Sequence, residues 1–488
     1  MIIEYDVIIV GLGPTGGTLA NLLGLNGLSV LILEKESAIY NLPRAVHFDD
    51  EIMRVFNSIG IKDKIKKKII INKGTKFVDE EEKIILDWPR PKIITDNGFY
   101  PSYRFHQPDL ERSLRYSLKK FKNINILQNA NVEKITNNMD HVEVCYMDKK
   151  SMKQHIINTK YVVGCDGGRS FIRKQIKSVM EDLGFKQKWI VIDVILKANK
   201  KSLPDRTIQY CNPDRPATFC RNVGRRRRWE VALKENENFE TFFAEKNLWN
   251  FLNQWVKPEE IDIERKAIYT FESAIAKKWK YKRTFLAGDA AHLTPPFMGQ
   301  GMCAGIRDVS NLAWKLSLAC RNGHNEKLLQ SYQTERSPNV RDYINTTMKM
   351  GELLNAIGST NVSDTVFMQS DGTIKMDTIK PRLGKGLGSK GDINKGKNFP
   401  LIKLKDGSFF DEFFGGTPIL IAEKKIMENL KNINISIPVL AIEKFPELTS
   451  VFEKFNTQGL IIRPDRYILA SADEVNGVTF LERALETL

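Results

Sequence analysis

The chain has 488 residues, of which 42% are hydrophobic and 27% are charged, and its formal net charge is +15. This length predicts two or three domains, and the composition excludes an intrinsically disordered protein. No apolar run reaches the ~18 residues that span a bilayer, and Glu4 and Asp6 interrupt the apolar start, unlike a signal-peptide core, so we expect a soluble, cytoplasmic protein.

The positive charge permits binding to nucleic acid or to a membrane surface, but its distribution argues against both. Lysines are spread along the chain, and only residues 62–68 and 225–228 form dense basic clusters. We therefore interpret the excess as solvated surface and expect no nucleic-acid or membrane partner. The six cysteines are scattered, without a CxxC pair or a spacing suited to zinc, which predicts reduced thiols and no metal site.

The N-terminal region has the pattern of a dinucleotide-binding unit. Residues 5–10 (YDVIIV) predict a buried strand, GLGPTG follows at once, residues 17–27 have helical spacing, and residues 28–33 predict a second strand. In a Gly-x-Gly-x-x-Gly turn, the first glycine permits the turn, the second lets backbone approach a pyrophosphate, and the third lets helix and strand pack. Here these glycines are Gly11, Gly13 and Gly16.

Glu34 ends the second strand, where a carboxylate can accept both hydroxyl hydrogens of an adenosine ribose. A carboxylate there favours FAD or NAD over NADP, because it pairs with a free 2′-hydroxyl. This unit alone does not separate FAD from NAD. Downstream, the pattern predicts helices at 49–59 and 107–118 and strands at 124–127, 142–146 and 161–164.

The run VVGCDGGRS (residues 162–170) places Asp166 and Gly167 in a tight turn after a buried strand. An ordinary β-turn is the alternative interpretation of this run. Residues 185–270 then alternate between apolar and polar side chains, which predicts antiparallel strands with one solvated face. The first domain is thus predicted to be interrupted by a second domain and resumed after it.

A buried strand is predicted again at residues 283–287, and GDAAH follows it. Gly288 leaves room for the chain of a cofactor, and the Asp289 carboxylate can accept hydrogen bonds from ribityl hydroxyls. Pro295, Pro296, Gly299 and Gly301 then lead into a helix that begins near Met302. The N-terminus of that helix would stabilise negative charge on the pyrimidine edge of a reduced flavin, so we expect the dinucleotide to be FAD.

Residues 358–398 contain several Gly, Lys, Asp and Ser and little periodicity, which predicts a linker. Short strand and helix patterns restart after it. The predicted domains are an FAD-binding domain in two parts (1–184 and 271–357), an antiparallel sheet domain (185–270), the linker (358–398) and a small C-terminal domain without cysteine (399–488).

In their order and spacing, these motifs resemble those of the group A flavoprotein monooxygenases, the aromatic hydroxylases with one FAD-binding domain. PRAVHFDDE (43–51), QKWIVID (187–193) and GQGMCAGIRDVSNLAWKL (299–316) are most similar to the 3-(3-hydroxyphenyl)propionate hydroxylase subgroup. The resemblance implies an α/β fold: a Rossmann-like FAD-binding domain of the glutathione-reductase type, an inserted antiparallel β-sheet substrate domain and a small thioredoxin-like C-terminal domain.

By the same resemblance, contacts with FAD come from both parts of the FAD-binding domain. The implied contact residues are Gly11, Gly13, Pro14, Thr15, Gly16, Glu34, Lys35, Arg44, Gln107, Val132, Asp166, Gly167, Gly288, Asp289, Pro296, Gly299, Gly301 and Met302. By the resemblance, NADH or NADPH would bind only transiently.

The implied reaction is hydroxylation of a phenolic or other aromatic small molecule by oxygen. NAD(P)H would reduce FAD, and a flavin C4a-hydroperoxide would transfer the hydroxyl group. His47 and Pro295 are the candidate catalytic residues, with His47 as a base for the phenol. Arg215, Arg221 and Arg225 are candidate partners for an acidic tail on the substrate.

Two alternatives remain open. A related flavoprotein reductase or oxidase of the same fold would act without oxygen transfer, so it would be reduced without NAD(P)H or would release only peroxide. A basic nucleic-acid-binding protein on a degenerate flavin fold would bind RNA in a salt-sensitive way without flavin. The sequence does not determine the aromatic substrate, the choice between NADH and NADPH, or the oligomeric state, for which a homodimer is one option.

Overall fold

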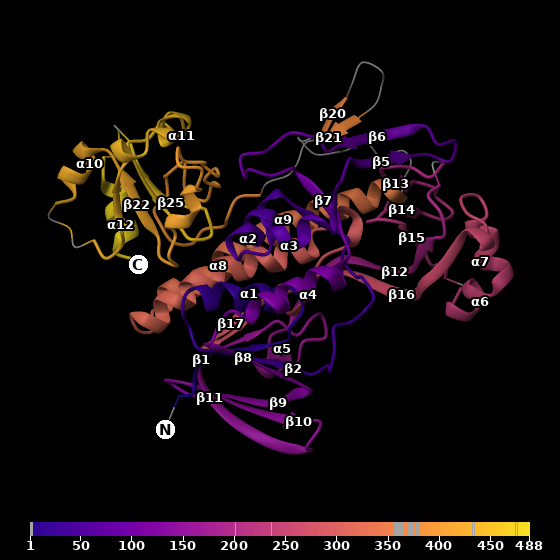
Figure 1. Cartoon of the computed structure of the whole chain (residues 1–488), viewed down its shortest axis with the longest axis horizontal. Helices are drawn as coiled ribbons and strands as arrows, with labels where there is room; N and C mark the ends of the chain where they lie inside the picture. The colour runs from indigo at the N-terminus through magenta and orange to yellow at the C-terminus, as the bar shows by residue number, and fades with distance from the viewer. Residues whose placement is uncertain are drawn as a thin grey trace.

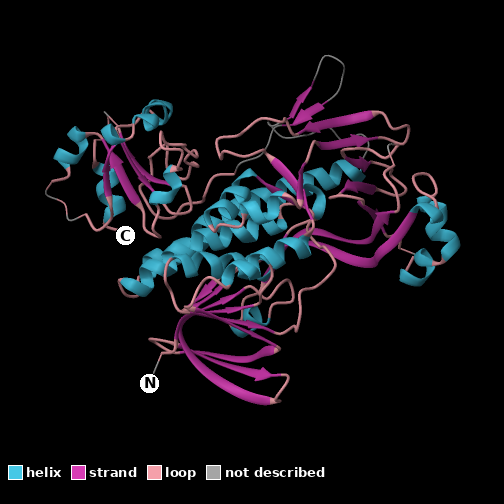
Figure 2. Cartoon of the chain, in the orientation of Figure 1, coloured by secondary structure: helices cyan, strands magenta, loops and turns pink. Residues whose placement is uncertain are grey.

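The computed structural model describes residues 3–200, 202–235, 237–355, 366–368, 374–376, 381–431, 433, 435–473, 475 and 477–488. Over these residues the chain is a mixed α/β fold with four sheets (Figures 1 and 2). In Figure 1 a layer of long helices crosses the middle of the molecule, with the first sheet below it and the C-terminal region at the upper left. Among the described helices, none is long and apolar enough to cross a membrane.

The first sheet contains the predicted dinucleotide-binding unit. Its central strands are parallel and buried, which is why residues 7–10 and 30–33 are continuous apolar runs. Across the sheet the order is β17 (Lys280–Tyr281), β18 (Thr284–Leu286), β11 (Lys153–Gly164), β1 (Tyr5–Val10), β2 (Val30–Glu34) and β8 (Ile124–Gln128). Two antiparallel strands extend from β11, namely β10 (Val142–Asp148) and β9 (Ala130–Asn137). Because β18 pairs with β11, residues 284–286 return to the sheet that the N-terminus begins.

The helices over this sheet bring distant parts of the chain together. The helix α1 packs against both α4 and α8, and α8 packs against α9. Their bounds are α1 (Pro14–Leu25), α2 (Asp50–Ser58), α3 (Lys62–Lys66), α4 (Gln107–Leu118), α5 (Phe171–Gln175), α8 (Gly301–Arg321) and α9 (Glu326–Asn355). The structure confirms the helix predicted at residues 107–118 with the same bounds, because its amphipathic pattern and the Pro108 near its start are both local signals.

The second sheet has ten strands and lies to the right in Figure 1. Its order is β19 (His292–Leu293), β16 (Ile261–Ala276), β12 (Met180–Leu196), β15 (Arg226–Ala232), β14 (Ala217–Arg221), β13 (Thr207–Tyr210), β5 (Gly74–Val78), β6 (Ile84–Pro89), β21 (Ile374–Met376) and β20 (Val366–Met368). Two short helices, α6 (Phe239–Phe243) and α7 (Glu245–Leu252), pack on it. The antiparallel pairing of β12, β14, β15 and β16 agrees with the alternation read from residues 185–270.

Two features of this sheet are absent from the sequence analysis. The strands β5 and β6 come from the N-terminal part of the chain, yet β5 pairs in parallel with β13. The long strands β12 and β16 also run across positions 184 and 270, where we placed domain boundaries. A sheet edge that is completed by a strand ~130 residues away leaves no local pattern, because the pairing depends on tertiary contact.

The segment predicted as a linker, residues 358–398, is not uniform. Its strands β20 and β21 pair with each other, and β21 pairs with β6, so these six residues extend the second sheet. Three-residue strands are too short to show a periodic pattern, which is why the sequence analysis did not identify them. Residues 358–365, 369–373 and 377–380 lie outside the described residues, and residues 381–398 have no helix or named strand.

The C-terminal region has a sheet of its own, with the order β23 (Val439–Ala441), β22 (Ile419–Ala422), β24 (Gly459–Ile462) and β25 (Ile468–Ala472). Its helices are α10 (Lys424–Asn429), α11 (Thr449–Phe455) and α12 (Thr479–Leu485). The strands β22 and β23 are parallel, and the other pairs are antiparallel. One apolar core of this region also contains Trp314, Leu318 and Leu328, so α8 and α9 pack directly against it.

A fourth, three-stranded sheet connects the two large ones. Its order is β3 (His47–Asp49), β7 (Ser102–Phe105) and β4 (Ile69–Ile71). In the pairing of β3 with β7, His47 lies opposite Arg104. This small sheet thus brings two polar residues to the junction between the dinucleotide-binding unit and the second sheet.

Candidate functional site

The glycine turn after β1 has two glycines that the protein itself requires and one that it does not. Gly11 has φ +100°, and a Cβ there would lie 2.5 Å from the carbonyl oxygen of Cys165. A Cβ on Gly16 would lie 2.1 Å from the carbonyl oxygen of Gly11. Gly13 precedes the N-terminus of α1, where Pro14 is the first helical residue, and a Cβ on Gly13 would meet no atom within 4 Å. The turn therefore leaves open space at the helix N-terminus, which is where a pyrophosphate fits.

Glu34 lies at the end of β2 and is buried against this turn. Its Oε2 accepts a hydrogen bond from the backbone N–H of Leu12 (2.7 Å), and its Oε1 accepts one from that of Glu36 (2.9 Å). The carboxylate therefore fixes the shape of the glycine turn as well as the edge of the predicted ribose site. Lys35, next to it, is exposed, and Val132 on β9 is buried in the apolar core of the first sheet.

The second glycine segment meets the first one directly. Gly288 follows β18 with φ +62°, and a Cβ there would lie 2.7 Å from the Oγ1 of Thr15. The structure therefore brings together two segments that are more than 270 residues apart in the sequence. The Asp289 carboxylate beside them is exposed, so it is available to hydroxyl groups of a ligand.

Asp308 supports this second segment and was not identified from the sequence. Its Oδ2 accepts hydrogen bonds from the backbone N–H of Gly288 (3.0 Å) and from His292 (2.7 Å), and its Oδ1 accepts one from Arg336 (2.9 Å). Burial acts to raise the Asp308 pKa, but the charges of His292 and Arg336 lower it overall. A buried aspartate on the second turn of α8 was the only local signal, and no spacing rule connects it with Gly288.

The Asp166 carboxylate is engaged within its own turn. It accepts hydrogen bonds from the Ser170 hydroxyl (2.5 Å) and from the backbone N–H groups of Phe171 (2.7 Å) and Ile172 (3.0 Å). Together with Ser170 it caps the start of α5. Gly167 follows with φ +80°. The alternative interpretation, a structural turn, therefore describes this carboxylate, and its contact with a cofactor stays a prediction.

Gln107 holds the backbone of the segment that contains Arg44. Its Oε1 accepts hydrogen bonds from the N–H groups of Arg44 (2.9 Å) and Ala45 (2.8 Å), and its amide group donates to Glu111 (2.8 Å). The Arg44 guanidinium lies over the ring of Tyr40, 5.6 Å from its centroid. The side chain of Gln107 thus positions the backbone of the segment that contains Arg44.

The run from Pro295 to Met302 forms a turn and then a helix. Pro295 precedes a short 3-10 helix (Pro296–Met298), Gly299 has φ +64°, and α8 begins at Gly301. Phe297 and Met298 are buried in an apolar cluster with Trp189, Trp88 and Phe77 of the second sheet. The space at Gly301 is open, since a Cβ there would meet no atom within 4 Å, and Met302 packs against the core around α2.

His47 is buried beside this turn and uses both ring nitrogens. Its Nδ1 lies 3.3 Å from the carbonyl oxygen of Gly299, and its Nε2 lies 2.8 Å from the Oγ of Ser102. Because a carbonyl can only accept, the ring proton is on Nδ1, and the Ser102 hydroxyl donates to Nε2. Burial, and next the charge of Arg104, lower the His47 pKa to about 3. The ring is therefore neutral near pH 7.

The structure places the three arginines that we named for an acidic tail in other interactions. Arg215 pairs with Glu237, Arg221 pairs with Asp205, and Arg225 is exposed and donates to the carbonyl of Lys197. A different arginine, Arg104, is buried opposite His47.

Arg104 is 7% exposed, and its guanidinium donates to the Oγ1 of Thr207 on the second sheet. Within the described residues it has no carboxylate within 4.0 Å, and its Nε–H has no acceptor. Burial lowers its pKa. Nothing in the local sequence distinguishes this arginine from the others, because only the pairing of β3 with β7 brings it beside His47.

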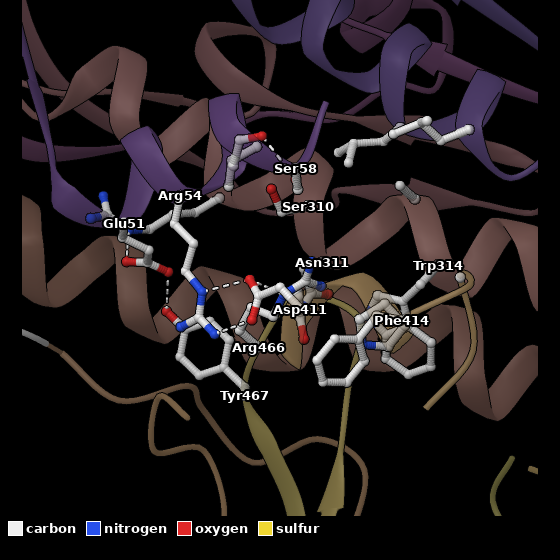
Figure 3. A pocket seen from close by; sticks show the side chains of 18 of the residues that line it. Glu51, Arg54, Ser58, Ser310, Asn311, Trp314, Asp411, Phe414, Arg466 and Tyr467 are labelled. Atoms are coloured by element: carbon white, nitrogen blue, oxygen red, sulfur yellow. Dashed lines mark hydrogen bonds and ion pairs between the residues drawn. The ribbon is translucent and has the colours of Figure 1, made fainter. Parts of the chain in front are cut away.

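A cavity of ≈ 600 Å³ lies between α2, α8 and the C-terminal region (Figure 3). None of the glycines in the two turns lines it. The glycine turns and this cavity are therefore two separate features, and the chemistry predicted from the sequence belongs to the turns.

The chain is similar to a known protein family and to several curated proteins. The family model for an FAD binding domain matches residues 4–347. The probable NADH-specific resorcinol 4-hydroxylase of Rhodococcus jostii is 37% identical over 354 residues, which cover 71% of this chain and 65% of that protein. The 3-(3-hydroxy-phenyl)propionate/3-hydroxycinnamic acid hydroxylase of Mycolicibacterium gilvum is 32% identical over 72% of this chain and 60% of its own length. The match thus spans less than two thirds of these relatives.

Solved structures share the fold at lower sequence identity. The flavin-dependent monooxygenase PieE, solved with FAD and substrate, aligns over 100% of this chain and 99% of its own with a TM-score of 0.79 and 16% identity. Aklavinone-11 hydroxylase, solved with FAD and aklavinone, aligns over 100% of both chains with a TM-score of 0.76 and 19% identity. These similarities extend through the C-terminal region of the chain.

Proposed function

The chain belongs to the FAD-binding group A flavoprotein monooxygenases, and from this premise we propose that it hydroxylates a small phenolic compound with NADH or NADPH and oxygen. The observation that carries the proposal is the meeting of the two glycine turns at Thr15, with open space at Gly13 and Gly301. When bound there, FAD supplies the hydride acceptor and the oxygen activation. The protein holds it and excludes water from the reacting groups.

We assign the adenosine half of FAD to the first glycine turn and to Glu34, and the ribityl half to Asp289. The N-terminus of α8 would then lie at the flavin ring, where its partial positive charge would favour negative charge on the ring. We propose that FAD is also contacted by the other residues predicted from the sequence, namely Pro14, Thr15, Lys35, Arg44, Gln107, Val132, Asp166, Gly167, Gly288, Pro296, Gly299 and Met302. Pro295 and the apolar cluster of Phe297 form the substrate side of the turn.

We also propose the predicted domain division, with residues 185–270, which form the centre of the second sheet, as the substrate domain and residues 399–488 as a thioredoxin-like domain. The C-terminal order β22, α10, β23, α11, β24, β25, α12, with its parallel and antiparallel pairs, supports that fold. The region has no cysteine, so it has no thiol redox role. All six cysteines are free in the structure, which supports a cytoplasmic location.

The function is tested by measuring NADH and NADPH oxidation by the flavin-loaded protein with a panel of phenols and phenolic acids. We expect one class of phenol to stimulate oxidation and to give a hydroxylated product in proportion. A protein that takes up no flavin would overturn the whole proposal. Stimulated oxidation that gives only hydrogen peroxide with every phenol would favour the oxidase alternative.

His47 is expected to have a positioning role, contrary to its prediction as a base. Because its pKa is about 3, it stays neutral and without a free lone pair over the working pH range. We expect His47→Asn to lower kcat while the shape of the pH profile of kcat from pH 5 to 9 stays that of the wild type. A variant that lost one limb of that profile would instead identify His47 as the titrating base.

Arg104 is proposed to pair with a carboxylate on the substrate, because this anion would give its Nε–H an acceptor. We expect Arg104→Gln to weaken binding of 3-hydroxybenzoate by about 10–100-fold, the usual loss for a hydrogen bond to a charged group, and that of neutral 3-hydroxybenzyl alcohol by less than about threefold. Flavin-absorbance titration of the holoprotein measures both affinities. Arg221→Gln is the control, since Arg221 pairs with Asp205 instead. Equal losses of affinity for both ligands would show that Arg104 does not pair with the carboxylate of the substrate.

A further inference from the structure

Arg307 on α8 connects three segments around the flavin-facing turn. Its Nε donates to Glu51 Oε2 (2.6 Å), one terminal amine donates to Asp49 Oδ2 (2.5 Å), and the other donates to Gln300 Oε1 (3.1 Å). All three partners lie close in sequence to residues of the predicted site: Asp49 ends the strand of His47, and Gln300 follows Gly299. Arg307 is 6% exposed, Asp49 is 7% exposed and Gln300 is 7% exposed, so most of this cluster is buried.

The C-terminal region reaches the same cluster through one hydroxyl group. The Tyr467 O–H donates to Glu51 Oε1 (2.7 Å), and Tyr467 is 8% exposed. Figure 3 shows Glu51 and Tyr467 together on the wall of the cavity, beside Arg54 and Asp411. Tyr467 is the residue before β25, so it is anchored by the C-terminal sheet.

We propose that the C-terminal region sets the position of the flavin-facing turn through Tyr467, Glu51 and Arg307, which act as positioning residues. This inference rests on the proposed function, since it concerns the turn at Gly299 and Gln300. The three side chains form a continuous series of hydrogen bonds from the C-terminal region to that turn.

The charges explain why the Tyr467 hydroxyl matters. The Arg307 guanidinium is shared between two carboxylates and reaches one oxygen of each, Asp49 Oδ2 and Glu51 Oε2. The hydroxyl satisfies the Glu51 oxygen that Arg307 does not reach. Without it, the Oε1 of the half-buried Glu51 lacks its protein donor, which favours a reorientation of Glu51. A reoriented Glu51 pulls on Arg307, and Gln300 loses its fixed donor.

The docking of the C-terminal region does not depend on this hydroxyl. Arg54 of α2 donates to both oxygens of Asp411 (2.6 and 2.8 Å) and to the carbonyl of Phe399 (2.5 Å). Arg466 also pairs with Asp411 (2.8 Å). The buried contacts of Arg54 with Asp411 and Phe399 hold the two parts together, so the hydroxyl of Tyr467 can be removed without separating them.

The test uses Tyr467→Phe in the full-length, flavin-loaded protein, which removes only the hydroxyl group. We expect about tenfold faster amide hydrogen exchange in residues 296–303, with or without flavin, because the turn loses part of its support. We also expect lower kcat and a larger fraction of NAD(P)H oxidised to peroxide, with unchanged KM for NAD(P)H. Arg307→Lys should show the same changes more strongly, since an ammonium group cannot replace three guanidinium contacts.

Lys454→Ala is the matched control, because it removes an exposed ion pair between the C-terminal region and Asp96 that is outside this series. Unchanged exchange at residues 296–303 in Tyr467→Phe, or an equal change in Lys454→Ala, would overturn the inference. The exchange measurement does not need turnover. A wild-type protein that hydroxylates no phenol would therefore refute the proposed function, while the exchange rates would still test the series of hydrogen bonds on their own.

Discussion

Replacing Glu335 by glutamine is expected to destabilise the folded chain by about 3–5 kcal/mol, because it leaves the buried ammonium of Lys315 without its paired carboxylate. Glu335, on α9, is 1% exposed and accepts hydrogen bonds from Lys315 of α8 (2.7 Å), Asn311 (2.8 Å) and the backbone of Leu387 (3.1 Å). Arg463 of the C-terminal region also pairs with it (3.0 Å). The midpoint of urea unfolding at pH 7 measures the loss.

The same carboxylate gives the protein an acid-sensitive contribution. Burial acts to raise the Glu335 pKa, but Arg463 and Lys315 lower it to about 2. Burial lowers the pKa of Lys315 to about 8, although the neighbouring charge of Glu335 acts to raise it. Arg463 is the stronger partner, because its guanidinium stays charged at every working pH, whereas Lys315 loses its proton as the pH rises above about 8.

The sign follows from the depressed pKa of Glu335. Its stabilisation is present above the unfolded-state pKa of about 4.3 and is lost as the pH falls towards 2. The stability difference between wild type and Glu335→Gln should thus be largest near pH 7 and should shrink between about pH 4 and 2. A difference that stayed constant over this range would show that another group dominates.

Replacing Gly13 by alanine is expected to weaken FAD binding by at least about tenfold, or ~1.4 kcal/mol, while the stability of the apoprotein stays within about 0.5 kcal/mol. The φ of −76° at Gly13 suits any residue, and its Cβ would meet no protein atom within 4 Å. The only object that the methyl group can hinder is therefore a ligand. Quenching of FAD fluorescence during titration of the apoprotein measures the affinity.

Gly16→Ala is the contrasting variant at the same turn. Its Cβ would lie 2.1 Å from the Gly11 carbonyl oxygen, so α1 must shift, and we expect the apoprotein itself to lose about 1–3 kcal/mol of stability. If Gly13→Ala bound FAD as tightly as the wild type, the pyrophosphate would not lie over this turn.

Local patterns were sufficient where function depends on consecutive residues. The strand, glycine turn, helix and Glu34 were predicted because the spacing of glycines and the apolar periodicity lie within ~30 residues. The helix at Gln107–Leu118 was predicted for the same reason. The low pKa of His47 was not predicted, because it depends on burial and on Arg104, and neither is visible in the segment around His47.

The sequence by itself thus determined the dinucleotide-binding unit, the second glycine segment and the family to which the chain belongs. Only the tertiary structure decided that β5 and β6 join the second sheet, that Asp308 supports Gly288 and that Tyr467 reaches Glu51. The physical reason is the range of the interactions. Helix periodicity and turn conformation are properties of a few neighbouring residues, whereas strand pairing and buried ion clusters exist only after distant segments have packed together.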